Sequence, residues 1–301
     1  MGFIFGNQVF PWSGVGTQAE EIQSRIEEYC HRDLTYDSDA LKAFDGILQK
    51  FRKMDTPVLN LYGIPIYTPE TFDPPLAISE HRLLNALGWY MKGTATRRSD
   101  IPSWTWVGWQ YQRDTICRFE FSFPKKLDRT YGERSFSHVS IELEFEDGRI
   151  MTLSRFWEGL LGKSELLYVP RHLVIHGAIM DMEVSETGKI SLSGADKLSF
   201  QLWGGWNKET WSSGSHRAPI RFIGFILGLR NGLRSNEEVI VLVLKETNEV
   251  NTYERVGIGH VTHLPTVKSL RAKSSWWKDE KFLDRLRSYD INCREEKIRL
   301  A

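Results

Sequence analysis

The 301-residue chain has few cysteines, no net charge and no long apolar run. Its three cysteines are widely separated and odd in number, which argues against a disulfide framework. Lysine plus arginine and aspartate plus glutamate both number 39, so the charge balance favours neither a nucleic-acid partner nor an anionic membrane. The longest apolar runs, near Phe222–Leu229 and Val239–Leu244, are too short to cross a bilayer. Because the first residues also lack the features of a signal peptide, we expect a cytoplasmic protein without a membrane partner.

The sequence also lacks the common motifs of catalysis and metal binding. It contains no Gly-x-Ser-x-Gly elbow, no Walker loop and no Gly-x-Gly-x-x-Gly after a strand. His260 and His263 are three residues apart, but no carboxylate or thiolate nearby completes a metal site. His172 and His176 flank another expected strand and are better explained as solvated or hydrogen-bonded side chains. The sequence therefore predicts no metal and no other cofactor, and an enzyme of unrecognised type is the least favoured interpretation.

Tryptophan, by contrast, is abundant, with 11 residues in the chain. Three of them lie in the segment Pro102–Trp109, which we call the tryptophan box, shortly after the basic pair Arg97–Arg98. A buried indole ring removes a large apolar area from water and needs one partner for its N–H group. We therefore expect an extended segment held in a core, with Trp104 and Trp106 on one side and Trp109 on the other.

Helical periodicity dominates the first 110 residues. Thr17 and Glu20 have the spacing of a capping box, and the apolar residues behind them fall on one helical face. A second stripe with core-facing spacing comprises Leu41, Phe44, Leu48 and Phe51. A third helix is expected over residues 79–90.

Beyond Trp109 the apolar pattern changes to a period of two, with glycine, asparagine, aspartate and serine at hairpin-like intervals. Strands are expected at 116–123, 139–145, 150–153, 173–175, 178–184, 190–192, 198–202, 220–227, 239–244 and 252–258, followed by a helix at 276–286. Such spacing favours an antiparallel sandwich or barrel. The predicted fold class is α+β: a small helical N-terminal subdomain (1–111) ending in the tryptophan box, then a mainly antiparallel β-sandwich or barrel-like domain (112–301) with a C-terminal helix.

Several stretches together resemble one protein family. They are residues 27–47 (EEYCHRDLTYDSDALKAFDGI), the turn Tyr62–Pro65, the pair Arg97–Arg98 and the tryptophan box, in that order. This series is similar to the region that follows the effector domain in fungal heterokaryon-incompatibility (HET) domain proteins. The segment Tyr253–Gly259 is similar to a strand near the end of many of these proteins, and the agreement is most specific over residues 20–110.

The resemblance implies a regulatory or recognition role in non-self recognition and programmed cell death. In the family, any catalytic activity would belong to the HET domain, whose closing motif is not found in this sequence. No catalytic residue is therefore carried over, and the expected partner is a protein of unknown identity. The residues that match the family motifs are Tyr29, Arg32, Asp39, Arg97, Arg98, Pro102, Trp104, Trp106, Gly108 and Trp109.

For these motif residues, packing is favoured over ligand binding. Arg32 could pair with Asp37 or Asp39 and fix the angle between two helices, since polar helix junctions are common. Arg97 and Arg98 could pair with carboxylates or stack on the indole rings of the tryptophan box.

The alternative function is a carbohydrate- or ligand-binding β-sandwich module. Trp203, Trp206 and Trp211 occur in a stretch rich in glycine, serine and asparagine, and exposed tryptophans can stack on sugar rings. A loop fixed by buried tryptophans is the favoured explanation. The segment 268–278 mixes basic and aromatic residues in the manner of a nucleic-acid groove, but the balanced net charge disfavours that partner.

Overall fold

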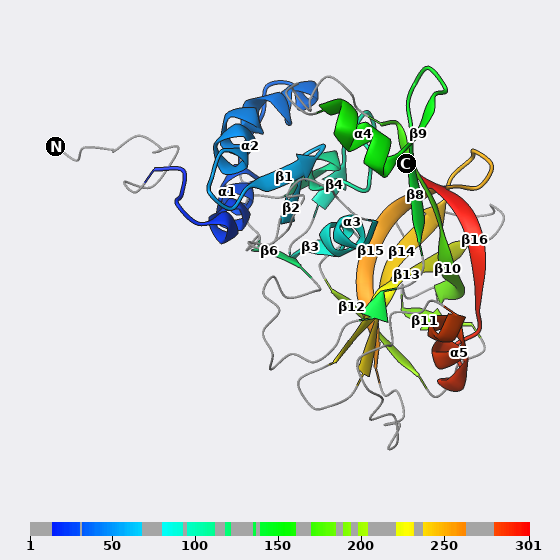
Figure 1. The fold of residues 1–301 in the computed structure, drawn as a ribbon. Helices are drawn as coiled ribbons and strands as arrows, with labels where there is room; N and C mark the ends of the chain where they lie inside the picture. Colours follow the sequence, from blue (N-terminus) through cyan, green and yellow to red (C-terminus); the bar gives the residue numbers. More distant parts are fainter. Residues whose placement is uncertain are drawn as a thin grey trace.

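The computed structural model describes residues 14–30, 32–67, 80–92, 95–111, 118–121, 135–136, 139–160, 170–184, 189–193, 198–203, 221–231, 237–262 and 280–301. Figure 1 shows helices from the first half of the chain on one side and a strongly curved sheet from the second half on the other. The predicted α+β fold class is confirmed.

Helices and a short hairpin form the N-terminal part. The elements are η1 (Ala19–Glu21), α1 (Ile22–Cys30), η2 (Asp37–Asp39), η3 (Lys42–Phe44), α2 (Asp45–Arg52), β1 (Val58–Leu61), β2 (Ile64–Tyr67) and α3 (Glu80–Leu87). Glu21, not the predicted Glu20, accepts the backbone N–H groups of Thr17 and Gln18, each at 2.7 Å. The predicted stripe Leu41, Phe44, Leu48 and Phe51 is buried, because η3 and α2 continue one apolar face.

Two small antiparallel pairs connect this part to the rest. Strand β3 (Trp89–Lys92) pairs with β6 (Arg118–Phe121), and β4 (Ala95–Arg97) pairs with β5 (Trp109–Tyr111). The third helix therefore ends earlier than predicted, since Gly88 closes α3 and the chain becomes extended at Trp89. The second pair joins the basic pair and the end of the tryptophan box.

Within the described residues, ten strands form one large sheet. They are β7 (Ser135–Phe136), β8 (Ser140–Glu144), β9 (Ile150–Thr152), β10 (His172–Val184), β11 (Ile190–Leu192), β12 (Ser199–Trp203), β13 (Phe222–Asn231), β14 (Glu237–Glu246), β15 (Thr252–Thr262) and β16 (Cys293–Leu300). Two helices, α4 (Leu153–Leu160) and α5 (Glu280–Ser288), accompany the sheet.

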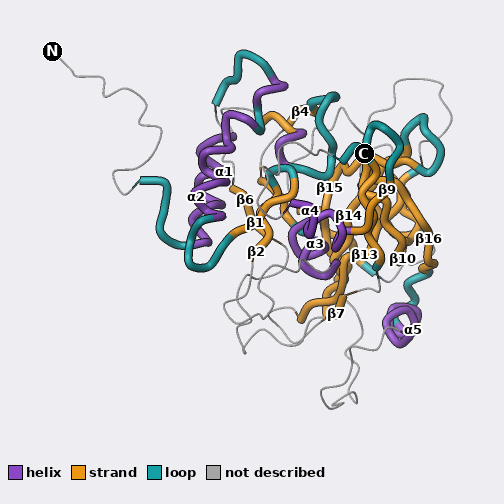
Figure 2. Tube along the Cα trace, turned by 45° about the horizontal axis from the view of Figure 1, so that its top comes forward, coloured by secondary structure: helices purple, strands orange, loops and turns teal. Residues whose placement is uncertain are grey.

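Five of these strands close into a ring. Neighbours pair in the order β13, β14, β15, β16 and β10, and β10 then pairs back to β13 through Ile179–Met182 and Phe222–Phe225. All pairs in the ring are antiparallel except β15 with β16, which is parallel. Of the two predicted β architectures, this ring favours the barrel-like one. Figure 2 shows its strands crossing beside the helical part.

Three local predictions in the sheet were wrong. The expected strands 173–175 and 178–184 are one strand, β10, in which Gly177 continues the extended chain where a Cβ would meet the Phe225 ring at 3.1 Å. Residues after Thr152 form α4 rather than the end of a strand. The carboxylates Glu142 and Glu144 alternate on one strand face, a pattern that predicts a solvated edge, but they lie on β8, which runs between β10 and β9.

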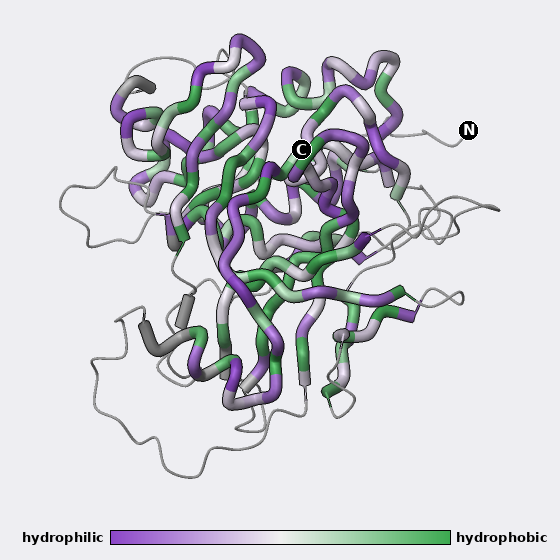
Figure 3. Tube along the Cα trace, turned by 90° about the vertical axis from the view of Figure 1, so that its right-hand side faces the viewer, coloured by the Kyte–Doolittle hydropathy of each residue, from purple (hydrophilic) through white to green (hydrophobic). Residues whose placement is uncertain are grey.

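The core crosses from the helices into the barrel. One apolar cluster includes side chains of α1, α2, α3, the tryptophan box and strands β8, β10 and β13–β16. A second, smaller cluster lies between the barrel and α5. Figure 3 shows hydrophobic segments of neighbouring strands lying side by side in the interior. The helical part is therefore packed on the sheet through a shared core.

The tryptophan box is buried as predicted, but it is not extended. After a turn at Ser103 and Trp104, a single 3-10 turn, η4, spans Trp106–Gly108. Thr105 caps this turn, since its Oγ1 accepts the backbone N–H of Val107 at 3.2 Å. A Cβ at Gly108 would collide with the carbonyl oxygen of Pro102, so glycine permits the close approach. The prediction that strand alternation places Trp104 and Trp106 on one side and Trp109 on the other therefore had the wrong basis, because the segment is a turn.

Candidate functional site

In the tryptophan box, the indole N–H groups of Trp106 and Trp109 both donate to backbone carbonyls. Trp106 Nε1 donates to the carbonyl of Gly63 at 2.7 Å, and Trp109 Nε1 donates to that of Ser103 at 2.9 Å. The Trp106 ring also packs edge-on against Phe44, with centroids 5.2 Å apart. The tryptophan box thus fixes the turn after β1 and the face of the helices.

The turn at Tyr62 and Gly63 fits against the box. Gly63 has a φ of +87°, and a Cβ there would lie 2.7 Å from a methyl group of Val107. Thr105 Oγ1 donates to the carbonyl of Tyr62 at 2.7 Å. Glycine is required here both by the backbone conformation and by the space available.

Arg255 joins the box to strand β15. Its backbone N–H donates to Ser103 Oγ at 2.8 Å, and its guanidinium donates to the carbonyls of Leu87, at 2.8 Å, and Trp89. The guanidinium carbon lies 3.9 Å from the centroid of the Trp89 ring. The side chain is fully buried, and burial lowers its pKa to about 9. At neutral pH a buried cation is therefore held by two carbonyls and one aromatic face.

As predicted, Arg97 and Arg98 pair with carboxylates, and Arg97 also lies over an indole ring of the tryptophan box. Arg98 Nε lies 2.8 Å from Asp37 Oδ1, and its Nη1 donates to the carbonyls of Val107 and Trp109. The Arg97 guanidinium lies over the Trp109 ring at 5.6 Å, and its Nε is 3.6 Å from Glu254 Oε1. Burial lowers the pKa of Arg97, although Glu254 opposes that effect.

The first motif segment is fixed mainly by Tyr29. Its hydroxyl donates to the carbonyl of Ala40 at 2.6 Å, and burial raises its pKa to about 12. Asp37, one of the two predicted partners of Arg32, forms its ion pair with Arg98. Asp39, the other, lies 3.9 Å from Lys42.

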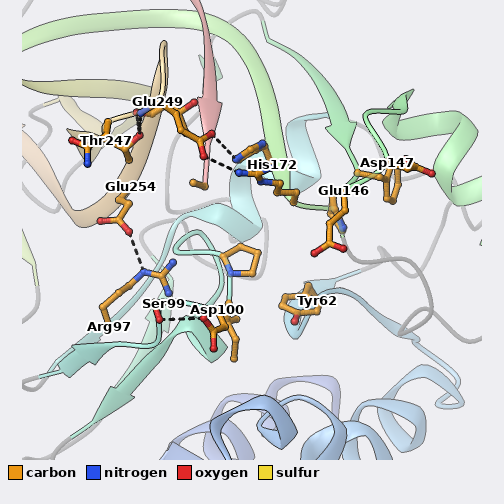
Figure 4. A pocket seen from close by; sticks show the side chains of 18 of the residues that line it. Tyr62, Arg97, Ser99, Asp100, Glu146, Asp147, His172, Thr247, Glu249 and Glu254 are labelled. Atoms are coloured by element: carbon orange, nitrogen blue, oxygen red, sulfur yellow. Dashed lines mark hydrogen bonds and ion pairs between the residues drawn. The ribbon is translucent and has the colours of Figure 1, made fainter.

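We call the contacts among Tyr29, Gly63, Ser103, Trp106 and Arg255 the motif junction. A cleft of about 1090 Å³ opens beside it (Figure 4). The cleft is lined by Tyr62, Arg97, Ser99, Asp100, Ile101, Pro102, Phe145, Glu146, Asp147, Arg149, Pro170, Arg171, His172, Thr247, Asn248, Glu249, Thr252, Glu254 and Ala301. One wall is the 97–102 loop with Tyr62, and the other comprises the β8–β9 and β14–β15 hairpins with the start of β10.

The three arginines of the cleft are all paired with carboxylates of the cleft. Arg149 pairs with Asp147, and Arg171 pairs with Glu249 at 2.7 Å. Arg97 faces Glu254, as described above. These pairs are largely exposed apart from Arg97, so each contributes little to stability and can rearrange for a ligand.

His172 is the most buried titratable side chain of the cleft. Its Nδ1 lies 3.2 Å from Glu144 Oε2, and its Nε2 lies 4.0 Å from Glu249 Oε2. Burial lowers the pKa of the imidazole, while Glu144 acts in the opposite direction. The prediction of a hydrogen-bonded histidine is confirmed for His172, and His176 is exposed.

Lowering the pH is expected to destabilise the fold through His172. Its folded-state pKa lies below the unfolded value of 6.5, so above that value both states are neutral and its contribution is complete. As the pH falls from about 7 to about 5.5, the unfolded chain binds the proton first and stability is lost. Urea unfolding should show a smaller loss over this range in His172→Gln than in the parent chain. Equal losses in both would contradict the assignment to His172.

The tryptophans of the alternative function are only partly described. Trp203 lies half-buried on β12, and its ring centroid is 5.3 Å from that of Tyr90 and 4.4 Å from that of His260, which lies at a steep angle to it. Trp206 and Trp211 lie outside the described residues, as does His263. Sugar binding on these rings therefore stays a prediction.

Comparison with known protein families, with curated proteins and with solved structures finds no match for this chain. In the part of the chain that the structure describes, no three or more histidine, cysteine, aspartate or glutamate side chains are grouped to hold a metal ion. The described helices include none with both the length and the apolar character needed to cross a membrane.

Of the predicted motif residues, Arg97 and Pro102 line the cleft, whereas Tyr29, Trp106 and Arg98 lie in or against the motif junction. Sequence reasoning missed the opposite wall of the cleft. Its residues follow no period, because they come from two hairpin turns and the start of a strand. From the sequence, only Glu254 could have been associated with this wall, because it lies in the Tyr253–Gly259 segment that resembles the family.

Proposed function

We propose that this chain is the region that follows the effector domain in a fungal HET-type protein. It acts in the cytoplasm as a non-catalytic recognition and regulatory region in heterokaryon incompatibility, and its partner is a protein. The cleft beside the motif junction is the site of recognition.

One observation carries this proposal: the stretches that resemble the family, although far apart in sequence, meet in the motif junction. The 27–47 segment contributes Tyr29, whose ring packs edge-on against Trp106 with centroids 6.0 Å apart. The Tyr62–Pro65 turn contributes Gly63, and the tryptophan box contributes Ser103 and Trp106. The segment near the end contributes Arg255. Short strings that match by chance have no reason to meet in space, so this convergence supports a resemblance that extends over the whole fold.

The shape and chemistry of the cleft support a protein partner. Its volume of about 1090 Å³ and its mixture of charged, polar and apolar lining residues suit a polar surface segment rather than a small apolar ligand. The cleft also lies where the two parts of the molecule meet, so occupancy can affect both.

The proposal is tested in a filamentous fungus that expresses the chain alone, a HET domain alone, or both as separate polypeptides. Cell death is scored by uptake of a membrane-impermeant dye. The chain alone should cause no death, and it should change the death rate caused by the HET domain. Arg255→Ala, which is expected to lower the free energy of unfolding by about 3–5 kcal/mol and so reduce the amount of folded chain in the cell, is the negative control. An unchanged death rate, or nucleotide turnover by the purified chain alone, would refute the proposal.

A further inference from the structure

We propose that the cleft binds an extended segment of a partner protein that carries lysine or arginine, with the cation held by Asp100 and Glu146. This inference rests on the proposed recognition function and specifies the chemistry of the partner.

The charges of the cleft favour a cationic ligand. Five side-chain carboxylates line it, Asp100, Glu146, Asp147, Glu249 and Glu254, against three arginines, Arg97, Arg149 and Arg171. The formal balance is therefore minus two, with His172 neutral, whereas the whole chain has a net charge of zero. Each arginine already faces one carboxylate of the cleft. An anionic ligand would have to displace these carboxylates first.

Two carboxylates remain after these pairs are counted. Asp100 accepts a hydrogen bond from the hydroxyl of Ser99 at 3.2 Å and forms no ion pair within 4.0 Å among the described side chains. Its charge acts on Arg97, but that guanidinium pairs with Glu254. Glu146 is exposed, and its carboxylate points into the open space toward Tyr62 (Figure 4). Asp100 belongs to the wall formed by the 97–102 loop, and Glu146 belongs to the opposite wall. A long flexible cation entering the cleft can therefore meet acceptors from both sides.

Exposed apolar side chains on the two hairpins favour a peptide ligand over a small cation. Described large hydrophobic side chains that are strongly exposed include Ile150, at 52%, and Val250, at 81%. Ile150 directly follows Arg149 in the β8–β9 hairpin, and Val250 directly follows Glu249 in the β14–β15 hairpin. Both hairpins contribute residues to the lining of the cleft, and these two exposed apolar side chains are the sequence neighbours of lining residues. Aliphatic residues on either side of a central lysine or arginine would cover them.

Fluorescence anisotropy with synthetic peptides tests this inference. One fluorescein-labelled pool of nonapeptides has lysine or arginine at the centre and aliphatic residues on both sides, and a matched pool has glutamate at the centre. The basic pool should bind the full chain, more weakly at high salt, and the acidic pool should not. The double substitution Asp100→Asn with Glu146→Gln should weaken binding about tenfold, because two partly exposed ion pairs are removed.

The matched control is Glu183→Gln with Glu295→Gln, which removes two exposed carboxylates that do not line the cleft. It should leave peptide binding unchanged. Absence of binding by the basic pool, or equal binding by the parent chain and the Asp100/Glu146 variant, would overturn the inference.

The fungal assay separates the two proposals. An effect on cell death that survives the Asp100/Glu146 substitutions would preserve the proposed function alone, whereas specific peptide binding without an effect on cell death would preserve the inference about the ligand alone.

Discussion

Replacing Arg255 with alanine is expected to lower the free energy of unfolding by about 3–5 kcal/mol. The guanidinium is fully buried and donates to the carbonyls of Leu87 and Trp89. Alanine leaves both carbonyls without these donors in a place that water does not reach. It also opens a cavity against the Trp89 ring, whose centroid now lies 3.9 Å from the guanidinium carbon. Loss of hydrogen bonding and loss of packing therefore add.

Denaturant unfolding followed by tryptophan fluorescence measures this loss, because buried indole rings such as Trp89, Trp104 and Trp106 enter water when the chain unfolds. Arg287→Ala is the matched control. Arg287 is exposed on α5 and pairs with Asp284 at 3.3 Å, so its replacement should change stability by less than about 1 kcal/mol. If the two alanine variants lose the same stability, the buried guanidinium does not hold the helical part to the barrel.

Arg255 also shows what a sequence pattern leaves open. In the string Tyr253–Gly259 an arginine among apolar residues has the appearance of an outward-facing charge on a strand. Its burial depends on acceptors at Leu87 and Trp89, more than 160 positions earlier in the chain. Local periodicity does not contain that information. The resemblance to a family marked the segment, but not the role of the arginine within it.

The elements that sequence predicted best are those whose neighbours are close in the chain. The stripe from Leu41 to Phe51 faces the core, and most strands from β8 to β15 occur near the expected positions, because one buried face produces a local pattern. Strand β16 was missed because charged residues occupy much of it. Several of these form ion pairs across β10 with strand β8, as Lys297 does with Glu142 and Arg299 with Glu144. The closure of the ring through β16 could therefore not be predicted from the sequence either.

The cleft could not be predicted for a related reason. Asp100, Glu146 and Glu249 each lie in a polar turn or loop that is ordinary when considered alone. Their shared position depends on how the tryptophan box sets the 97–102 loop against the hairpins of the barrel. That geometry follows from the 3-10 turn at Trp106–Gly108, where an extended segment was predicted.

Trp106→Ala is expected to lower the free energy of unfolding by about 3–5 kcal/mol. The ring is 1% exposed and packs against Tyr29 and Phe44, with centroids 6.0 Å and 5.2 Å away. Its N–H group also donates to the carbonyl of Gly63 at 2.7 Å. Removing the indole empties the centre of the contact between the tryptophan box and the helices. Denaturant unfolding should show an earlier transition.

Phenylalanine substitutions separate the hydrogen bond of Trp106 from its packing. Trp104 is equally buried, but its Nε1 has no hydrogen-bond partner among the described residues. Trp106→Phe loses a buried hydrogen bond and leaves the Gly63 carbonyl without that donor, which costs about 1–3 kcal/mol beyond the change in ring size. Trp104→Phe removes a donor that forms no bond and loses ring volume alone. Trp106→Phe should therefore be the less stable of the two variants. The opposite order would mean that packing, and not the bond to Gly63, determines the conformation of the box.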